Sequence, residues 1–440
     1  MYNIKARVCG AVITRGEKYL MSEILRIQGG ARLEGTVPIS GSKNAAVAII
    51  PAAILGDSPS VIHNLPDIDD VYSFVKILEY LGADVEFENG TMRVDPRGID
   101  KFELPDEMVN RMRASYYLVP TLMNRMGRAV VPTPGGCNIG NRPIDLTVNA
   151  LTSLGSKVDT AGGVIRAEKT DAFGGSNVYL RVPSVGATIN TMLAAAMAPG
   201  RTIIFNAARE PHIVDTANFL NSMGAHIRGA GMDTIRIEGV SSLHGCDEYW
   251  VIPDQIETGT LMIAAAATKG DVLLSGTIPT HMESLTAKLL EMGVDVTSED
   301  DVIHVRSVGD HRMIEVTTAV YPGFPTDLQQ PLTALMTVGW GRGKMTETIF
   351  ENRFRYLDEL NRMGADASVN NGVATIIGVE KLYGAKVTAT DLRAGAALVI
   401  AALMAEGVTE ISGVEYIKRG YEHLDEKLRH LGASIEYIET

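Results

Sequence analysis

Cysteine is scarce in this sequence. Only three occur among 440 residues, at Cys9, Cys137 and Cys246. An odd and sparse set cannot supply the disulfide framework of a small secreted domain, and it is typical of proteins from a reducing compartment. The sequence also has no cluster of cysteine and histidine with the spacing of a metal site. We therefore expect neither a disulfide-stabilised fold nor a metal centre.

Positive charge and long apolar runs are also lacking. The chain has 40 Lys and Arg against 53 Asp and Glu, a formal net charge of −13. This balance argues against a nucleic-acid partner, which requires a basic surface, but a local group of cations can still bind a small anion. Apolar runs such as 394–405 are too short to cross a membrane, and residues 1–20 contain no signal-type apolar core. We expect a cytoplasmic protein without a membrane or nucleic-acid partner.

Internal repetition is the strongest feature that is present. Six times an amphipathic helical pattern ends in Leu-Gly or Met-Gly, at intervals of roughly 70 residues. Glycine suits this position because it adopts the left-handed conformation without a Cβ clash. Hairpin patterns follow, with the favoured turn pairs Asn89-Gly90 and Asn371-Gly372. The six glycines are Gly82, Gly155, Gly224, Gly293, Gly364 and Gly432.

A second helix recurs in each unit and is apolar nearly all round, as in SVGATINTMLAAAMAPG and DLRAGAALVIAALMAEG. Helices of this kind are buried. Each unit thus contributes a buried helix, an amphipathic helix and several strands, which predicts an α/β fold with the helices inside. The chain is long enough for two or three domains. Two groups of three units would form two similar domains with a cleft between them.

Polar and charged residues stand at the starts of the buried helices. Helix N-termini carry free N–H donors and attract anions, so cations added there favour an anion site. A single such residue is more often part of a surface ion pair or a helix cap, and the pattern alone leaves both interpretations open. The residues are Lys43, Asn44, Arg113, Ser184, Val185, Gly186, Asp254, Glu257, Asp327, Asp391 and Arg393.

Two loops carry candidate reactive groups. In PTPGGCNIGNRPIDL, residues 132–146, glycines flank Cys137 and Arg142 follows. A nearby cation lowers the pKa of a thiol, although an inert cysteine is the alternative. In YPGFPTDLQQP, residues 321–331, Asp327 stands at a helix start. It could cap the helix or act as a general base toward a hydroxyl group.

Taken together, the motifs resemble one enzyme family. They are LEGTVPISGSKNA, MRAS, PGGCNIGNRPIDL, PSVGAT, IPDQIETGT, PGFPTDLQQP, ENRF, DLRA and KRGYEHLDEKLRHLGA. The chain resembles, from about Met21 to Ile438, the UDP-N-acetylglucosamine 1-carboxyvinyltransferases, which are enolpyruvyl transferases. The resemblance implies an inside-out α/β barrel with two domains, each a threefold repeat of βαβαββ-like units. Residues 1–42 plus 252–440 would form one domain, with 1–20 as an extension, and residues 43–251 the domain that carries the Cys137 loop.

The resemblance also implies an activity. Enzymes of this family transfer the enolpyruvyl group of phosphoenolpyruvate to the 3′-hydroxyl of UDP-N-acetylglucosamine and release phosphate, in the first committed step of peptidoglycan synthesis. No metal or organic cofactor is implied, and the partners are these two small molecules. Fosfomycin alkylates the loop cysteine in the family, so the drug is expected to inhibit this chain through Cys137.

Site residues follow from the resemblance by position. Catalytic roles fall on Cys137 as the acid, Asp327 as the acceptor of the hydroxyl proton, Lys43 and Arg419. Gln255 departs from the family pattern, in which a basic residue is expected, so that contact is in doubt. The substrate-binding positions are Lys43, Asn44, Arg113, Arg142, Pro143, Ile144, Asp145, Leu146, Ser184, Val185, Gly186, Asp327, Ile349, Arg353, Asp391, Arg393 and Arg419.

Two other functions compete with this one. The shikimate-pathway sister enzyme, EPSP synthase, transfers the same group to shikimate 3-phosphate, but it lacks the cysteine loop. A catalytically silent paralogue could bind UDP-N-acetylglucosamine and regulate a partner. The complete set Lys43, Cys137, Asp327, Arg393 and Arg419 favours an active enzyme. Phosphate release distinguishes these alternatives.

Overall fold

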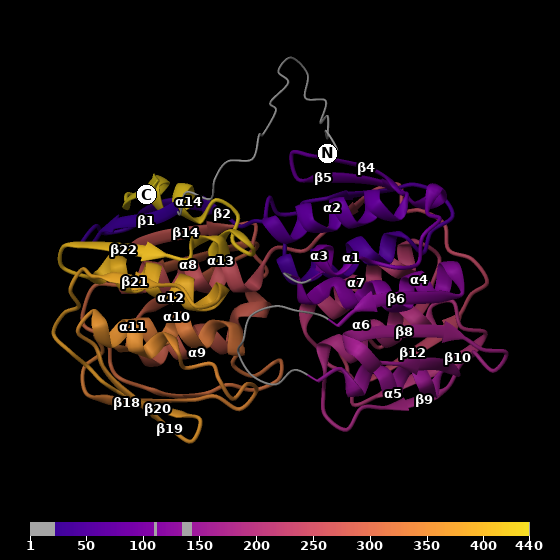
Figure 1. Ribbon diagram of the computed structural model, residues 1–440. Helices are drawn as coiled ribbons and strands as arrows, with labels where there is room; N and C mark the ends of the chain where they lie inside the picture. Colours follow the sequence, from indigo (N-terminus) through magenta and orange to yellow (C-terminus); the bar gives the residue numbers. More distant parts are fainter. Residues whose placement is uncertain (1–22, 110–111, 134–142, 440) are drawn as a thin grey trace, which may run out of the picture.

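The described chain folds into two lobes (Figure 1), and each lobe has its own hydrophobic core. The computed structural model describes residues 23–109, 112–133 and 143–439. One core draws on residues 45–251, and the other on residues 25–39 together with 256–435. We call these the central lobe and the terminal lobe, since the second is assembled from both ends of the described chain.

The apolar helices lie inside, as their sequences predict. In α12 (Leu392–Met404), every residue from 393 to 403 is buried. Its neighbours α8 (Gln255–Ala267) and α10 (Thr326–Met336) pack against it and against each other. A helix without a polar face is stable in water only when other elements cover it on all sides. The central-lobe counterparts are α1 (Lys43–Ala53), α4 (Leu118–Met126), which the 3₁₀ turn η2 (Arg113–Tyr117) precedes, and α6 (Val185–Ala195).

Amphipathic helices form the second component of each unit. All six repeat glycines that follow them have φ between 83° and 106°, the left-handed conformation expected after a helix. The sixfold repeat predicted from the sequence is therefore confirmed. These helices are α2 (Asp69–Leu81), α5 (Asp145–Ser153), α7 (Pro211–Ser222), α9 (Glu283–Glu291), α11 (Tyr356–Arg362) and α14 (Leu424–His430), and the short helices α3 (Asp106–Val109) and α13 (Val414–Lys418) accompany them.

Strands cover the outside of both lobes. The central-lobe strands are β3 (Ser60–His63), β4 (Asp84–Glu88), β5 (Thr91–Asp95), β6 (Arg128–Pro132), β7 (Ser156–Asp159), β8 (Val164–Lys169), β9 (Asn177–Tyr179), β10 (Gly200–Phe205), β11 (His226–Arg228), β12 (Thr234–Gly239) and β13 (Tyr249–Trp250). The terminal-lobe strands are β1 (Glu23–Gln28), β2 (Glu34–Pro38), β14 (Asp271–Ser275), β15 (Asp295–Glu299), β16 (Val302–Arg306), β17 (Glu315–Thr317), β18 (Arg342–Thr346), β19 (Asp366–Asn370), β20 (Val373–Ile377), β21 (Lys386–Thr388), β22 (Val408–Ser412) and β23 (Ser434–Glu439).

Within the described residues the strands pair into six small sheets with one shared design. Five sheets have four strands, in the orders β13-β3-β5-β4, β11-β12-β10-β9, β15-β16-β14-β2, β17-β18-β20-β19 and β21-β22-β1-β23. The sixth, β6-β8-β7, has three strands, and a single parallel bridge between Glu103 and Val130 takes the place of the fourth. Both predicted hairpin turns are confirmed, since Asn89-Gly90 and Asn371-Gly372 have positive φ between antiparallel strands.

Two chain segments connect the lobes and pair with each other. The amide of Ser42 donates to the carbonyl of Ile252 at 2.7 Å, and that of Asp254 donates to Ser40 at 2.9 Å. Cys246 is buried, and its Sγ accepts from the hydroxyl of Ser222 at 3.1 Å. Along the described stretches, none of the helices has both the length and the apolarity needed to cross a bilayer.

Candidate functional site

A buried carboxylate joins two of the predicted catalytic cations. Asp70, in the first turn of α2, lies 2.9 Å from Nζ of Lys43 and 3.0 Å from Nε of Arg419. Lys43 begins helix α1 of the central lobe, whereas Arg419 follows α13 of the terminal lobe. The ion pairs of Asp70 therefore connect the two lobes. We call Asp70, Lys43 and Arg419 the cross-lobe cluster.

Asp70 remains ionised in this position. Burial alone would raise its pKa, but the nearby charges of Lys43 and Arg419 and their hydrogen bonds lower the pKa below the usual value. The carboxylate thus holds a fixed negative charge between two positive groups. An anionic substrate that approaches Lys43 and Arg419 meets cations already oriented by a protein carboxylate.

A second carboxylate is held in the same way, within the terminal lobe. Asp327 accepts from Nη2 of Arg353 at 2.6 Å through Oδ1 and from Nη2 of Arg393 at 3.0 Å through Oδ2. Both arginines are only 3% exposed, while the Asp327 side chain keeps 28% of its surface accessible. The two guanidinium groups orient Asp327 at the second residue of α10. We call Asp327, Arg353 and Arg393 the terminal-lobe cluster.

The electrostatics of Asp327 limit its basicity. Burial alone would raise its pKa, yet Arg393 and Arg353 lower it far below the usual value. A carboxylate in two such ion pairs is a weak proton acceptor. It becomes a stronger one only when a guanidinium group moves away from it.

Further contacts connect residues near the two clusters. Asp254 caps helix α8 and also accepts from the backbone amide of Lys43 at 2.8 Å. The guanidinium of Arg393 lies 5.1 Å from the ring centre of Tyr421, two residues after Arg419. Burial would lower the pKa of Arg393, but the surrounding Tyr421, Asp327 and Asp254 raise it. Residues at the starts of α1 and α8 and in the first turn of α12 therefore lie close together here.

Predicted substrate-binding residues at the starts of η2 and α6 form a separate group in the central lobe. The Arg113 guanidinium lies 5.9 Å from the ring centre of Tyr116, and burial lowers its pKa. Gly186 lies so close to this ring that an added Cβ would fall 1.6 Å from the Tyr116 hydroxyl. Ser184 caps α6 through the amide of Ala187, and Val185 is the first residue of that helix. This packing gives Gly186 a structural reason to be glycine.

Further predicted residues lie at the start of α5. Asp145 is paired with Arg181 at 2.5 Å, and both side chains are more than a third exposed. Ile144 and Leu146 flank it and pack against the central-lobe core, while Pro143 is exposed. Cys137 and Arg142, the predicted acid and one of the predicted cations, lie outside the described residues.

Two of the remaining predicted residues, Asp391 and Ile349, have internal hydrogen-bond partners. Asp391 caps α12 through the amides of Arg393 and Ala394, and it also accepts from Gln330 at 3.3 Å. The amide of Ile349 donates to the buried carboxylate of Glu347 at 2.7 Å. Asn44 is half-buried in the first turn of α1. Gln255 is the first residue of α8, directly after the cap Asp254.

Sequence reasoning missed two buried carboxylates. Asp70 occupies a core-facing position of α2, in phase with Phe74 and Ile77, which are buried. Glu347 follows β18 in phase with its buried residues Gly343 and Met345. A charged residue at an apolar position of the pattern is the signal that could have found both, because an unpaired buried charge is costly.

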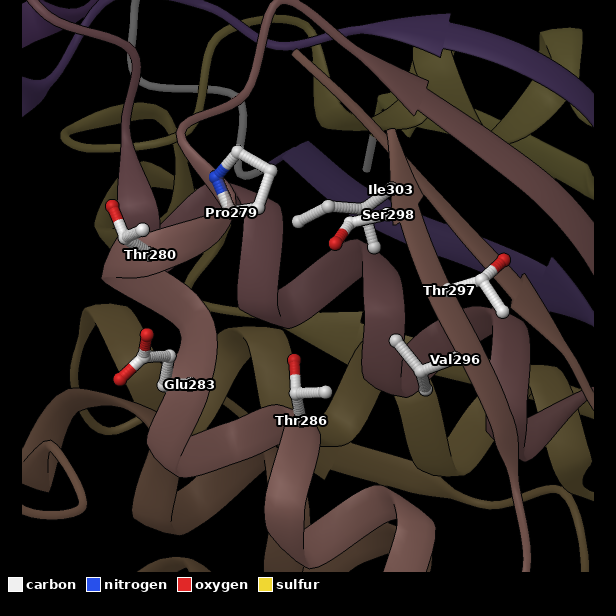
Figure 2. Close-up of a pocket in the computed structure, with 8 residues that line it drawn as sticks. All are labelled: Pro279, Thr280, Glu283, Thr286, Val296, Thr297, Ser298 and Ile303. Atoms are coloured by element: carbon white, nitrogen blue, oxygen red, sulfur yellow. The ribbon is translucent and has the colours of Figure 1, made fainter. Parts of the chain in front are cut away.

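A surface hollow elsewhere does not extend the site. It holds about 170 Å³ between α9 and strands β15 and β16 of the terminal lobe. Glu283 is the one charged residue among the eight labelled side chains in Figure 2. A lining without cations does not favour an anion. Within the described residues, no group of three or more His, Cys, Asp or Glu is placed to hold a metal ion.

Comparison with known proteins places the chain among enolpyruvyl transferases. Residues 27–428 match the family model of EPSP synthase (3-phosphoshikimate 1-carboxyvinyltransferase). UDP-N-acetylglucosamine 1-carboxyvinyltransferase 3 of Caldanaerobacter subterraneus subsp. tengcongensis is 54% identical over 93% of this chain and 98% of its own length. UDP-N-acetylglucosamine 1-carboxyvinyltransferase 2 of Bacillus subtilis is 52% identical over 94% of this chain and 96% of its own length.

Solved structures agree on the architecture. The enolpyruvyl transferase NikO from Streptomyces tendae superposes with a TM-score of 0.86 at 28% identity, covering 95% of this chain and 99% of its own. EPSP synthase from Acinetobacter baumannii gives a TM-score of 0.74 at 19% identity, covering 95% of this chain and all of its own, and shows the shared fold alone. The α/β class with two lobes of threefold repeats and buried helices, predicted from the sequence, is confirmed.

Proposed function

This chain belongs to the UDP-N-acetylglucosamine 1-carboxyvinyltransferase family, and from this premise we propose that it transfers the enolpyruvyl group of phosphoenolpyruvate to the 3′-hydroxyl of UDP-N-acetylglucosamine. The observation that carries the proposal is the 54% identity to a curated relative of that name over nearly the full length of both chains. In the reaction, C3 of phosphoenolpyruvate is protonated while the hydroxyl oxygen attacks C2. Loss of a proton from C3 and of phosphate from C2 then restores the double bond. The reaction would supply the first committed step of peptidoglycan synthesis in the cytoplasm.

The cross-lobe cluster would bind the phosphoenolpyruvate. Lys43 and Arg419 lie on either side of Asp70 within ion-pair distance, so their charged ends point into one region. The carboxylate and phosphate of the substrate need cations that stay fixed while charge moves from C3 to the leaving phosphate. Asn44 beside Lys43, Arg393 and Arg142 would complete this set.

Asp327 would accept the proton of the sugar hydroxyl. Its partly exposed carboxylate is oriented by Arg353 and Arg393, but both ion pairs suppress its basicity. We therefore infer that substrate draws at least one guanidinium, by preference that of Arg393, away from Asp327 toward the phosphate or carboxylate. Loss of that contact raises the pKa of Asp327 and prepares it as a base.

The acid would be Cys137, as the resemblance implies. Arg113, Asp145, Ser184 and Ile349, with their neighbours, would hold the nucleotide sugar from both lobes. Closure of two domains, 43–251 against 1–42 plus 252–440, would exclude water from the reacting atoms. The separate cores of the two lobes and the paired connecting segments support this division.

The test is phosphate release from phosphoenolpyruvate with UDP-N-acetylglucosamine, with shikimate 3-phosphate, and with neither. We expect release only with the nucleotide sugar, and fosfomycin is expected to abolish it. Release with shikimate 3-phosphate alone would instead assign the sister activity, which the family model covers but the relatives at 52–54% identity do not favour. Binding of UDP-N-acetylglucosamine without release would indicate a silent paralogue.

A further inference from the structure

Glu347 is a buried charged residue for which the proposed chemistry has no role. It is 8% exposed and follows strand β18. Its Oε2 accepts from the hydroxyl of Thr326 at 2.7 Å. Its Oε1 accepts from the hydroxyl of Thr318 at 2.9 Å and from the backbone amides of Ile349 and Phe350 at 2.7 and 3.2 Å. Four donors from three segments thus converge on one carboxylate.

One of these donors leads directly to Asp327. The hydroxyl of Thr326 accepts from Nη1 of Arg353 at 2.9 Å, and Nη2 of the same guanidinium donates to Asp327 at 2.6 Å. A threonine hydroxyl has a single proton. Because that proton is directed to Glu347, the oxygen presents a lone pair to Arg353. Since Arg353 can only donate and both carboxylates can only accept, every hydrogen bond between Glu347 and Asp327 has a single possible direction.

A second path reaches the same guanidinium. Arg353 lies 5.2 Å from the ring centre of Phe350, whose backbone amide donates to Glu347. The position of the ring thus depends on the same carboxylate. Ile349, whose amide is the other backbone donor to Glu347 in this turn, is a proposed contact of the nucleotide sugar.

We propose that Glu347 is a positioning residue, which sets Arg353 and through it Asp327, and which holds the Ile349 backbone for the nucleotide sugar. The inference rests on the proposed function for the identity of the reacting groups. Glu347 itself touches neither Asp327 nor any reacting atom. Its effect is the orientation of a guanidinium group whose distance decides how basic Asp327 is.

The chain offers a matched pair of variants. Thr318→Val and Thr326→Val each delete one hydroxyl that donates to Glu347, at 2.9 and 2.7 Å, but only Thr326 contacts Arg353. We expect Thr326→Val to lower kcat of phosphate release roughly ten- to a hundredfold, because a displaced orienting group misplaces the base. Thr318→Val should leave kcat close to wild type at a similar loss of melting temperature. Thr326→Ser, which keeps the hydroxyl, should restore kcat.

Glu347→Gln gives a different signature. The glutamine side chain keeps one acceptor oxygen, but it presents either its NH₂ group or a neutral carbonyl oxygen to the hydroxyl of Thr326. We expect lower kcat, a higher KM for UDP-N-acetylglucosamine through the Ile349 turn, and an unchanged KM for phosphoenolpyruvate. Combined with Thr326→Val, its effect on kcat should be less than multiplicative, whereas with Thr318→Val the effects should multiply.

A readout without substrate separates this inference from the proposed function. Among the residues that the structure describes, the charged and titratable groups that act on Asp327 are Arg353, Arg393 and, from α7, His212. The low pKa of Asp327 contributes stability at neutral pH that is lost as the pH falls below about 4. Thr326→Val should weaken the contact with Arg353, raise the pKa of Asp327 and flatten this acid dependence of the melting temperature, while Thr318→Val leaves it unchanged.

Equal losses of kcat in Thr318→Val and Thr326→Val, without rescue by Thr326→Ser, would make Glu347 a purely structural residue and overturn the inference. An identical acid dependence of melting in the two valine variants would do the same, whether or not the chain turns over. A wild-type chain that releases no phosphate would instead contradict the proposed function. The acid dependence of the melting temperature would then be the measurement that shows whether Glu347 positions Asp327 through Thr326 and Arg353.

Discussion

The cross-lobe and terminal-lobe clusters use the same electrostatic arrangement for different purposes. In each, one carboxylate is shared by two cations, and its pKa is lowered. Asp327 takes both arginines from its own lobe, so its cluster is complete whether the lobes are close together or apart. Asp70 takes Lys43 from its own lobe and Arg419 from the other. In the proposed function the terminal-lobe cluster orients the base, whereas the ion pairs of the cross-lobe cluster form only when the two lobes are close together.

The largest effect is expected at Asp327. Asp327→Asn removes the proposed base, and kcat of phosphate release should fall by about 10²–10⁴-fold. The substitution also leaves two buried arginines without their shared partner, which costs roughly 3–5 kcal/mol of stability. Asp358→Asn in α11 makes the same change at an exposed position and is the control. A kcat within threefold of wild type in folded Asp327→Asn would remove Asp327 from the mechanism.

A buried histidine of the central lobe interacts electrostatically with Asp327 of the terminal-lobe cluster. His212, at the start of α7 in the central lobe, has its pKa lowered to about 4 by burial, although the charge of Asp327 acts in the opposite direction. The unfolded chain binds a proton here below its ordinary pKa of 6.5, whereas the folded chain does not. Stability should therefore fall by about 1.4 kcal/mol per pH unit between these values, on the order of 3 kcal/mol in all.

His212→Gln should remove this part of the acid dependence, as measured by denaturant unfolding from pH 7 to pH 4. Asp215 on the same helix has its pKa raised to about 6 by burial, so its titration opposes the loss of stability in acid. Because Asp215 is present in both proteins, the difference between the two stability curves gives the contribution of His212. His226→Gln makes the same substitution at an exposed position of β11 and is the control. Parallel curves for wild type and His212→Gln would contradict the assignment.

The cross-lobe cluster should respond more mildly than the terminal-lobe cluster. Asp70→Asn leaves Lys43 and Arg419 charged but no longer held at one spacing, and kcat should fall roughly tenfold. Because a negative charge is removed beside the anion site, KM for phosphoenolpyruvate should fall as well. Asp69→Asn makes the same charge change one residue away, where no ion pair to Lys43 or Arg419 forms. A higher KM, or equal effects of both variants, would contradict the proposed role.

The sequence predicts much more of the fold than of the candidate site. Helix periodicity and the repeat glycines predict the buried helices and the two hairpin turns because those signals are local. The pairing of Lys43 with Arg419 through Asp70 joins positions far apart in the chain, and no local pattern contains it. Asp391 illustrates the opposite difficulty, since the cap that it provides for α12 and a substrate contact have the same local sequence signature.

The smallest effect is expected at an exposed ion pair of the same chemistry. Asp145 and Arg181 are 2.5 Å apart, closer than Asp70 is to either of its cations, but their side chains are 41% and 68% exposed. Water and salt screen such a pair, and the ordering of two side chains opposes its attraction. Arg181→Ala should therefore change the free energy of unfolding by less than about 1 kcal/mol, and this difference should vanish in high salt. A larger loss that persists in salt would mean that burial does not set the strength of the ion pairs in this protein, and the contrast between exposed and buried carboxylates would fail with it.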